Sequence, residues 1–279
     1  MPSIVITGAS GFFGAHLRVR FSHMGVDVIP VSRRSIPGGI KVDDYASSPL
    51  GDTLIHLAEE SDRSLVNQAG EDYVVNSART ITGLVSRSYK RIIYVSSSTV
   101  YGDASSIPRK VGDKVYGKDI YNQGKLTCEK IVLDSGGSVV RLTNIFGAGM
   151  SKKNVISEII EQIPNSGPIL IRNDLSVRDY IHVTDLAKGH LASIDYLFQN
   201  DNDLTINLGT GSGHSVFEII KMTEVISKRK INFKVSKRRD GDPDVVIASS
   251  EKAKQLINWS PSNSDLRNII GSTWNIYNR

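Results

Sequence analysis

The sequence predicts an α/β fold, in which a doubly wound parallel sheet with helices on both faces is joined to a smaller α/β unit. Two observations support this prediction. In the first 145 residues short apolar runs alternate with helical patterns, and the first strand, helix and second strand fit within about 30 residues, as in a parallel βαβ unit. After residue 144 glycines and prolines become frequent and the alternation weakens, which indicates a second unit.

We expect strands at 4–6, 26–31, 53–57, 91–95 and 138–142, because each is a short apolar run. Helical patterns lie between them, at 15–21, 73–85 and 121–133. In the second unit, strands are expected at 169–171 and 180–183, and helices at 185–198 and 215–227. The basic run at 228–239 alternates with apolar residues and is typical of a solvated strand face.

Composition narrows the class of protein. Hydrophobic residues make up 39% and charged residues 23% of the 279, which excludes a wholly disordered chain. The net charge of +5 suits an anionic ligand but does not by itself indicate nucleic-acid binding. The single cysteine, Cys128, excludes an internal disulfide framework and a multi-cysteine zinc site, and we expect no metal. No run of about 18 apolar residues and no signal-peptide pattern is present, so we expect a cytoplasmic protein.

Glycines follow the first strand at three-residue spacing, at positions 8, 11 and 14. Gly8 allows a tight turn, Gly11 lets the backbone approach a pyrophosphate, and Gly14 allows close packing of the helix on the strand. The N–H groups at the start of the helix then face the phosphates. The spacing therefore predicts a dinucleotide site, and an ordinary tight turn between strand and helix is the alternative.

The end of the second strand bears on the choice of dinucleotide. Dinucleotide-binding units that take NAD usually have an acid there for the ribose 2′-hydroxyl, whereas this chain has Ser32, Arg33 and Arg34. A guanidinium suits a 2′-phosphate, so the sequence favours NADP over NAD. A pair of solvated loop arginines is the alternative.

Tyr121 and Lys125 lie four residues apart, on one face of an expected helix. An ammonium beside a phenol favours the phenolate form, which makes the tyrosine a usable acid or base. Ser97 follows an expected strand at the edge where open α/β sheets bind ligands, so its hydroxyl is a candidate to hold the oxygen on which Tyr121 acts. A polar strand end is the alternative for the serine.

In order along the chain, these motifs resemble those of the extended short-chain dehydrogenase/reductases, and within them the nucleotide-sugar epimerase/dehydratase family. The resemblance runs through nearly the whole chain, at residues 7–14, 55–58, 76–80, 97–102, 121–125, 140–147, 177–185, 206–216, 238–242 and 258–261. It implies a Rossmann-type dinucleotide-binding domain at 1–145 and a smaller nucleotide-sugar-binding domain at 146–279, from which about 175–210 returns to the first. It also implies a nucleotide-diphosphate sugar as substrate, no nucleic-acid or membrane partner, and a homodimer.

The resemblance implies a role for each matching site residue. The catalytic residues that it implies are Ser97, Tyr121 and Lys125. The expected contacts with NADP or NAD are Gly8, Ser10, Gly11, Phe12, Phe13, Gly14, Ser32, Arg33, Arg34, Asp43, Leu57, Ala58, Asn76, Tyr121 and Lys125. The expected substrate contacts are Ser98, Asn144, Arg178, Arg239 and Asp242, with the two arginines on phosphate and Asp242 on the nucleoside ribose. Surface ion pairs are the alternative for the arginines.

The chain departs from the family pattern at three places. Glu59 and Glu60 stand where the family usually has small residues, beside the expected cofactor. The segment 34–53 is short, which implies an open adenosine pocket, and the segment 151–172 is short, which implies a reduced substrate lid.

The resemblance implies oxidation and reduction at C4 of the sugar, and it favours a UDP-hexose 4-epimerase. The alternative is an NADPH-dependent reductase of nucleotide 4-keto-6-deoxysugars, which Arg33 and Arg34 favour. A remote alternative is a non-catalytic NADP-binding regulator, which has no need of the Tyr121 and Lys125 pair. Ser98 stands where the family's dehydratases have an acid, which disfavours a dehydratase.

Overall fold

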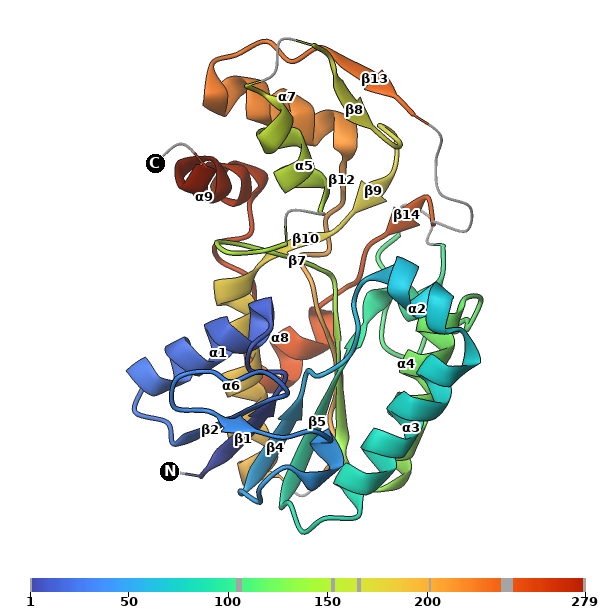
Figure 1. The fold of residues 1–279 in the computed structure, drawn as a ribbon, viewed down its shortest axis with the longest axis vertical. Helices are drawn as coiled ribbons and strands as arrows, with labels where there is room; N and C mark the ends of the chain where they lie inside the picture. Colours follow the sequence, from blue (N-terminus) through green and yellow to red (C-terminus); the bar gives the residue numbers. More distant parts are fainter. Residues whose placement is uncertain are drawn as a thin grey trace.

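A computed structural model describes residues 2–103, 107–151, 154–164, 167–200, 202–236 and 243–277 (Figure 1). Its main element is a seven-stranded sheet with the order β11-β6-β5-β4-β1-β2-β3, in which every neighbouring pair is parallel. The strands are β1 (Ile4–Thr7), β2 (Val28–Ser32), β3 (Ile40–Lys41), β4 (Thr53–His56), β5 (Arg91–Ser97), β6 (Ser138–Leu142) and β11 (Thr205–Leu208). The predicted fold class, with its doubly wound parallel sheet, is confirmed.

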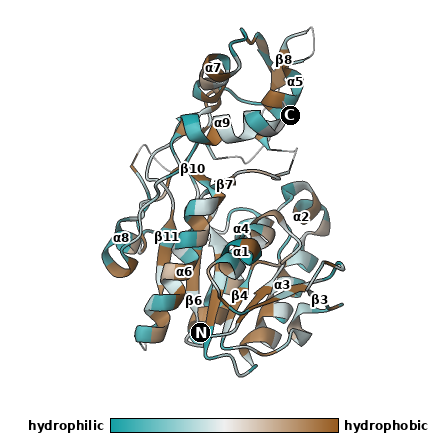
Figure 2. Cartoon of the chain, turned by 90° about the vertical axis from the view of Figure 1, so that its left-hand side faces the viewer, coloured by the Kyte–Doolittle hydropathy of each residue, from teal (hydrophilic) through white to brown (hydrophobic). Residues whose placement is uncertain are grey.

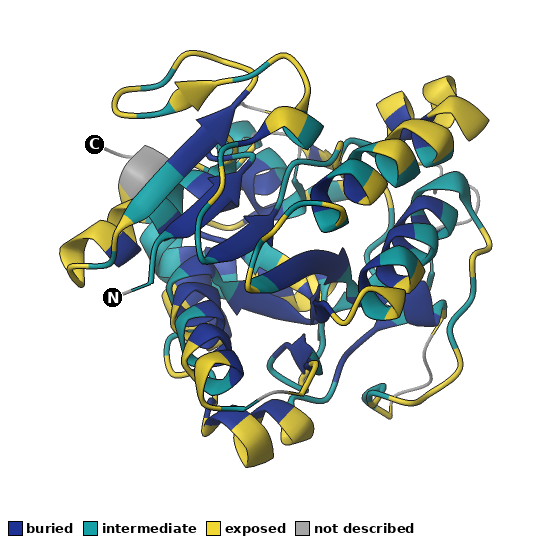
Figure 3. Ribbon diagram, turned by 90° about the horizontal axis from the view of Figure 1, so that it is seen from below, coloured by how far each residue is buried: buried dark blue, intermediate teal, exposed yellow. Residues whose placement is uncertain are grey.

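Helices cover both faces of this sheet (Figure 1). On one face lie α1 (Phe12–His23), α6 (Val183–Gln199) and α8 (Glu251–Ile257), and on the other α2 (Arg63–Ala69), α3 (Glu71–Val85) and α4 (Ile120–Asp134). Successive side chains of a strand point to opposite faces, so Ile4 and Ile6 share a core with Leu17 of α1, whereas Val5 shares one with Leu84 of α3. The central strands are accordingly hydrophobic in Figure 2 and buried in Figure 3, whereas β3 at the edge of the sheet is exposed.

Above the carboxyl ends of the strands lies a second group of short strands and helices (Figure 1). β7 (Asn144–Phe146) pairs with β10 (Tyr180–His182), β8 (Ile169–Ile171) with β13 (Phe233–Val235), and β9 (Val177–Arg178) with both β12 (His214–Ser215) and β14 (Val245–Val246). The helices here are α5 (Val155–Gln162), α7 (Val216–Ser227) and α9 (Leu266–Tyr277). They enclose a core of their own, which includes Ile159, Ile219 and Ile269.

The structure differs from the sequence prediction at several elements. α1 begins at Phe12, so Gly14 lies inside the helix rather than before it. The sequence did not indicate β11, α2, α5, α8 or α9, and of these α2 and α8 have only seven residues each, too few to give a clear helical periodicity. Between β2 and β4 only the two-residue β3 and a single turn of 3₁₀ helix, η1 (Tyr45–Ser47), are formed, so this edge of the sheet is sparsely covered.

In the described part of the basic run at 228–239, a strand forms at Phe233–Val235, which is β13. Lys234 and Val235 are exposed there, as a solvated strand requires, and residues 237–239 lie outside the described residues. No helix within the described ranges is both long and apolar enough to span a bilayer.

Candidate active site

The glycine loop passes directly beneath the carboxyl end of β4. Gly8 has a φ of +72°, and a Cβ on it would lie 3.0 Å from the backbone of Ala58. A Cβ on Gly14 would lie 2.3 Å from the carbonyl oxygen of Gly8, which is far below van der Waals contact. The N–H of Gly11 donates to that same carbonyl at 2.9 Å. The loop therefore requires glycine at positions 8 and 14 for its backbone path alone.

The loop delivers the N-terminus of α1 to a cavity of about 460 Å³, the glycine-loop cavity. The N-cap of α1 is Gly11, and no side chain caps the helix, so the first N–H groups have no side-chain acceptor. Such a helix end favours an anion. The residues lining this cavity are Gly8, Gly11, Phe12, Phe13, Gly14, Leu57, Glu59, Glu60, Ser61, Arg63, Val95, Ser96, Ser97, Thr99, Tyr121, Lys125, Leu142, Thr143, Asn144, Ile145, Met150, Ser151 and Asn154.

Tyr121 and Lys125 both line this cavity from the first turns of α4. The helix begins where Asp119 accepts a hydrogen bond from the N–H of Asn122 at 2.8 Å. The ammonium of Lys125 lies 5.7 Å from the centre of the Tyr121 ring, on the same helix face. Lys125 is fixed further by donating to the carbonyl of Val95 in β5, at 2.9 Å. The predicted pairing of the two side chains in one cleft is present.

Ser97, at the end of β5, is held by a chain of hydrogen bonds. Its Oγ lies 3.0 Å from Oγ1 of Thr99, which donates to Oδ1 of Asn122 at 2.8 Å. Asn122 in turn donates its Nδ2 hydrogen to Asp119 at 3.0 Å. Since Asp119 caps α4, the serine hydroxyl and the Tyr121 helix share one polar network.

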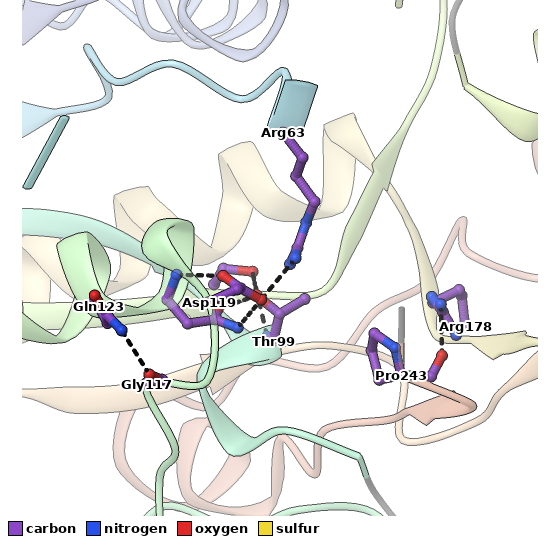
Figure 4. A network of polar contacts seen from close by, with 9 residues as sticks. Arg63, Thr99, Gly117, Asp119, Gln123, Arg178 and Pro243 are labelled. Carbon is purple, nitrogen blue, oxygen red and sulfur yellow. Dashed lines mark hydrogen bonds and ion pairs between the residues drawn. The ribbon is translucent and has the colours of Figure 1, made fainter. Parts of the chain in front are cut away.

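Arg63, which the sequence reading did not single out, completes the same network from α2. Its Nη1 lies 3.0 Å from Oδ2 of Asp119, and its guanidinium lies 4.9 Å from the centre of the Tyr121 ring. Figure 4 shows the arginine reaching down to Asp119 beside Thr99. Tyr121 is therefore flanked by two cations, Arg63 and Lys125, each of which is paired with an acid.

A second cavity of about 300 Å³, the arginine cavity, opens from the first. Arg172, directly after β8, and Arg178 of β9 line it. Half-buried Arg178 donates to the carbonyl of Pro243, as Figure 4 shows, and to that of Asp244. Arg172 is more exposed, 3.9 Å from Glu158. The two cavities share the lining residues Arg63, Thr99, Asn144, Ile145, Met150 and Asn154.

The end of β2 stands apart from both cavities. Ser32 is buried, and its hydroxyl donates to Oγ of Ser10 at 2.7 Å. Arg33 and Arg34 are exposed, and the guanidinium of Arg33 lies 5.7 Å from the centre of the Tyr45 ring. Among the described residues no carboxylate stands at positions 32–34, in agreement with the sequence.

Not every expected site residue is brought to the cavities. As lined by the described residues, neither cavity includes Ser10, Ser32, Arg33, Arg34, Asp43, Ala58, Asn76 or Ser98. Asn76 is exposed on α3, whereas Ser98 is 2% exposed at the start of the 3₁₀ turn η2 (Ser98–Tyr101). Thr99, the next residue, lines both cavities instead. Arg239 and Asp242 lie outside the described residues.

Glu59 and Arg63 are two charged lining residues that sequence reasoning did not assign to the site. An acidic residue shortly after an apolar strand was a usable signal for Glu59, because ligands bind at the carboxyl ends of parallel strands. Arg63 follows Asp62, whose side chain accepts from the N–H of Ser64 at 2.9 Å and starts α2. That capping pattern predicts a helix start, but not that the start faces a cavity.

Comparisons with known proteins agree with this arrangement. The model of the NAD dependent epimerase/dehydratase family matches residues 4–209. The UDP-glucose 4-epimerase of Rhizobium meliloti (strain 1021) is 25% identical, over 99% of this chain and 97% of its own length. A UDP-glucose-4-epimerase from Stenotrophomonas maltophila, solved with bound NAD and formylated UDP-arabinopyranose, matches 100% of this chain and 98% of its own, with a TM-score of 0.90 and 23% identity.

A further solved relative is 25% identical, the UDP-glucose 4-epimerase from Bifidobacterium longum in complex with NAD⁺ and UDP. It matches 99% of this chain and 98% of its own, with a TM-score of 0.85. The family model covers well over half of the chain, and the relatives match it from end to end. This chain belongs to the NAD-dependent epimerase/dehydratase family and is an enzyme of the extended short-chain dehydrogenase/reductase type.

Proposed function

We propose that this enzyme is a UDP-hexose 4-epimerase, which oxidises C4 of the sugar and reduces it again on the opposite face. One observation carries the proposal: the glycine-loop cavity, with Tyr121 and Lys125, is continuous with the arginine cavity. A dinucleotide in the first cavity and a nucleotide diphosphate in the second would bring their reacting ends together at the shared lining residues. Relatives matched over their full length carry the name UDP-glucose 4-epimerase, which supports the same reaction.

The residues present fit a dinucleotide. The start of α1 and the backbone of Gly8 and Gly11 would hold the pyrophosphate, because no side chain caps the helix and its first N–H groups open on the cavity. Lys125 would bond the nicotinamide ribose, and Leu57 and Phe13 would line the pocket. The bound nicotinamide supplies hydride acceptance and hydride return, which no side chain provides.

The chain's own residues handle the proton. Tyr121 would take the proton of the C4 hydroxyl and later return it, with the Lys125 ammonium 5.7 Å from the centre of its ring. Ser97 would hold the same oxygen, because its hydroxyl is fixed by Thr99 and opens on the same cavity. Fixed donors of this kind lower the barrier by orientation and by charge stabilisation.

The arginine cavity would hold the nucleotide diphosphate. Arg178 is the expected phosphate contact, with Asn144 at the junction of the two cavities. Arg172 lies in the same wall and adds a second guanidinium, which the sequence reading did not propose. Contacts by Ser98, Arg239 and Asp242 stay predictions, as does the homodimer, which the molar mass in solution from light scattering tests.

The residues at the end of β2 are expected to lie near the 2′ position of the adenosine ribose, where NAD and NADP differ. The related structures hold NAD, and NAD is the cofactor of the family. We propose that the site accepts NADP as well, because Arg33 and Arg34 are exposed at this edge and no carboxylate at positions 32–34 repels a 2′-phosphate. The same observation favours the second candidate function, an NADPH-dependent 4-keto-sugar reductase. Chromatography of the dinucleotide released on denaturation identifies which one the protein retains.

The test of the proposed reaction uses purified enzyme without added cofactor. UDP-glucose and UDP-galactose are expected to interconvert, because a recycled cofactor stays bound through the cycle. Tyr121→Phe is expected to lower kcat by about 10²-fold or more, whereas Tyr89→Phe, which lines neither cavity and loses hydrogen bonds to Pro49 and Arg87, should keep it. Stoichiometric NADPH oxidation by a 4-keto nucleotide sugar, without interconversion, would establish the reductase instead.

A further inference from the structure

The roles assigned above do not include Glu59, although it is a buried acid in the wall of the glycine-loop cavity. Its side chain is 6% exposed. The N–H of Glu59 donates to the carbonyl of Leu57 at 2.9 Å, which closes a tight turn directly after β4. A carboxylate is rarely this buried unless it is paired with a cation or a hydrogen-bond donor. The group that pairs with Glu59 therefore indicates its role.

The partner of Glu59 is the ammonium of Lys125. Oε2 of Glu59 lies 2.5 Å from Nζ, and the lysine side chain is 8% exposed. The other carboxylate oxygen, Oε1, accepts from the hydroxyl of Tyr94 at 2.7 Å. Lys125 also donates to the carbonyl of Val95 at 2.9 Å, so its ammonium is held by a carboxylate from the turn after β4 and by a backbone carbonyl of β5.

Several other titratable side chains surround this pair. They are His56 of β4, Tyr94 of β5, Tyr73 of α3, Tyr121 and Cys128 of α4, and Arg63 of α2, over the Tyr121 ring. Burial lowers the pKa of His56 to about 4, and it raises the pKa values of Tyr73, Tyr94 and Cys128. These four groups are therefore neutral at neutral pH, and the carboxylate of Glu59 balances the charge of Lys125.

The two members of the pair stabilise each other's charge. Burial works to lower the pKa of Lys125, but the carboxylate of Glu59, with a further contribution from Tyr121, raises it, and the pKa lies above its usual value. Burial likewise works to raise the pKa of Glu59, and the Lys125 ammonium, with a smaller contribution from His56, holds it below the usual value. Removal of Glu59 leaves a buried ammonium without a counter-ion, and burial then dominates its protonation.

We propose that Glu59 is a positioning residue of the reaction: its carboxylate is the buried counter-ion that keeps Lys125 charged and in place beside Tyr121. The catalytic use of Lys125 rests on the proposed function, whereas the pairing itself does not. Glu59 acts through the lysine, so its removal is expected to change the pH range of activity rather than the affinity for the nucleotide sugar.

The direct test follows the protonation of Lys125 by NMR. The protein is labelled with lysine carrying ¹³C at Cε, the Lys125 signal is assigned by its loss in Lys125→Arg, and the signal is followed as the pH is raised. We expect the wild-type midpoint to stay above that of free lysine, and the Glu59→Gln midpoint to fall by about one pH unit or more. Equal midpoints in the two proteins overturn the proposal.

A second buried pair, between Glu129 of α4 and Arg141 of β6, provides the control. Oε2 of Glu129 lies 2.6 Å from Nη2 of Arg141, and Glu129 is 3% exposed. Glu129→Gln should destabilise the fold in a similar way and leave the Lys125 midpoint unchanged. If Glu59→Gln does not fold, Glu59→Ala takes its place, because it restores a small residue of the family pattern, and the Lys125 midpoint should fall in this variant too.

A Lys125 midpoint that falls as far in Glu129→Gln as in Glu59→Gln contradicts a specific role for Glu59.

Kinetics give the second measurement. The alkaline limb of the kcat profile of Glu59→Gln should move to lower pH by the shift that NMR measures, with KM for the nucleotide sugar changed less than about twofold. An alkaline limb identical to that of the wild type contradicts the proposal. If neither protein interconverts UDP-hexoses, the proposed function fails, and the NMR titration still decides whether Glu59 keeps Lys125 charged.

Discussion

Single residues of the glycine loop show how closely the backbone is packed at the site. Gly14 lies in the first turn of α1 against the carbonyl of Gly8, and Gly8 lies beneath Ala58. Neither position has room for a methyl group, and the loop that they allow brings the free end of α1 to the cavity. The glycines at positions 8 and 14 are therefore required for steric reasons, and we expect cofactor binding to depend on the loop that they allow.

Gly14→Ala tests this requirement. Its Cβ would lie 2.3 Å from the Gly8 carbonyl oxygen, so the helix has to move away from the loop. We expect a loss of about 1–3 kcal/mol in the free energy of unfolding, measured with urea, together with loss of the retained nicotinamide. Gly271→Ala in α9, where a Cβ meets nothing within 4 Å, should be neutral or stabilising. Full retention of stability and cofactor by Gly14→Ala would show that the loop has room to adapt.

At the scale of elements, the short strands of the upper unit position the arginine cavity. His214 of β12 pairs with Arg178 of β9, and Ser215 is the N-cap of α7. The hydroxyl of Ser215 accepts from the N–H of Glu218 at 3.2 Å, while the Glu218 carboxylate accepts from the N–H of Ser215 at 2.7 Å. This capping box fixes the start of α7 to the strand that lies beside Arg178.

Ser215→Ala is expected to lower the free energy of unfolding by about 1 kcal/mol, because it removes the side-chain acceptor of the cap. Ser22→Ala, at an exposed position in α1, should change it by less than about 0.5 kcal/mol. Urea unfolding of both variants beside the wild type measures the difference. Equal stability of the two variants would contradict a role for the cap.

The elements also show what the sequence could and could not predict. The Tyr121 and Lys125 pair and the glycine loop were predictable, because both follow from local spacing on one helix or one turn. The buried pairing of Glu59 with Lys125 was not, since it joins positions on different elements through a turn at residue 58. The same holds for Arg63, whose place over Tyr121 depends on how α2 packs against α4.

At the scale of the whole molecule, two buried histidines tie the stability of the fold to pH. Burial lowers the pKa of both His56 and His190 to about 4. His56 lies at the end of β4, and His190 of α6 packs edge-on against the ring of Phe13 at 5.0 Å. Both are neutral in the folded protein, whereas in the unfolded chain each takes up a proton near its ordinary pKa of about 6.5.

The unfolded state therefore binds more protons than the folded state between about pH 6.5 and 4, and stability falls as the pH drops through this window. Each histidine is expected to account for about 2 kcal/mol by pH 5. His190→Gln should remove roughly half of the loss between about pH 7.5 and 5, measured by urea unfolding. His23→Gln, at the exposed end of α1, should keep all of it, and an equal slope in both variants would be inconsistent with a buried neutral His190.

The proposed reaction, which needs both parts of the molecule, is tested most directly by following the hydrogen on C4 of the sugar. UDP-galactose carrying deuterium at C4 is incubated with the purified enzyme in ordinary water, without added cofactor, and the product is read by NMR and mass spectrometry. Because the hydride is expected to leave C4 and return to it within one active site, UDP-glucose should form with its deuterium retained at C4. Absence of interconversion, or product whose C4 label has been replaced by hydrogen from the solvent, would contradict the proposed 4-epimerase.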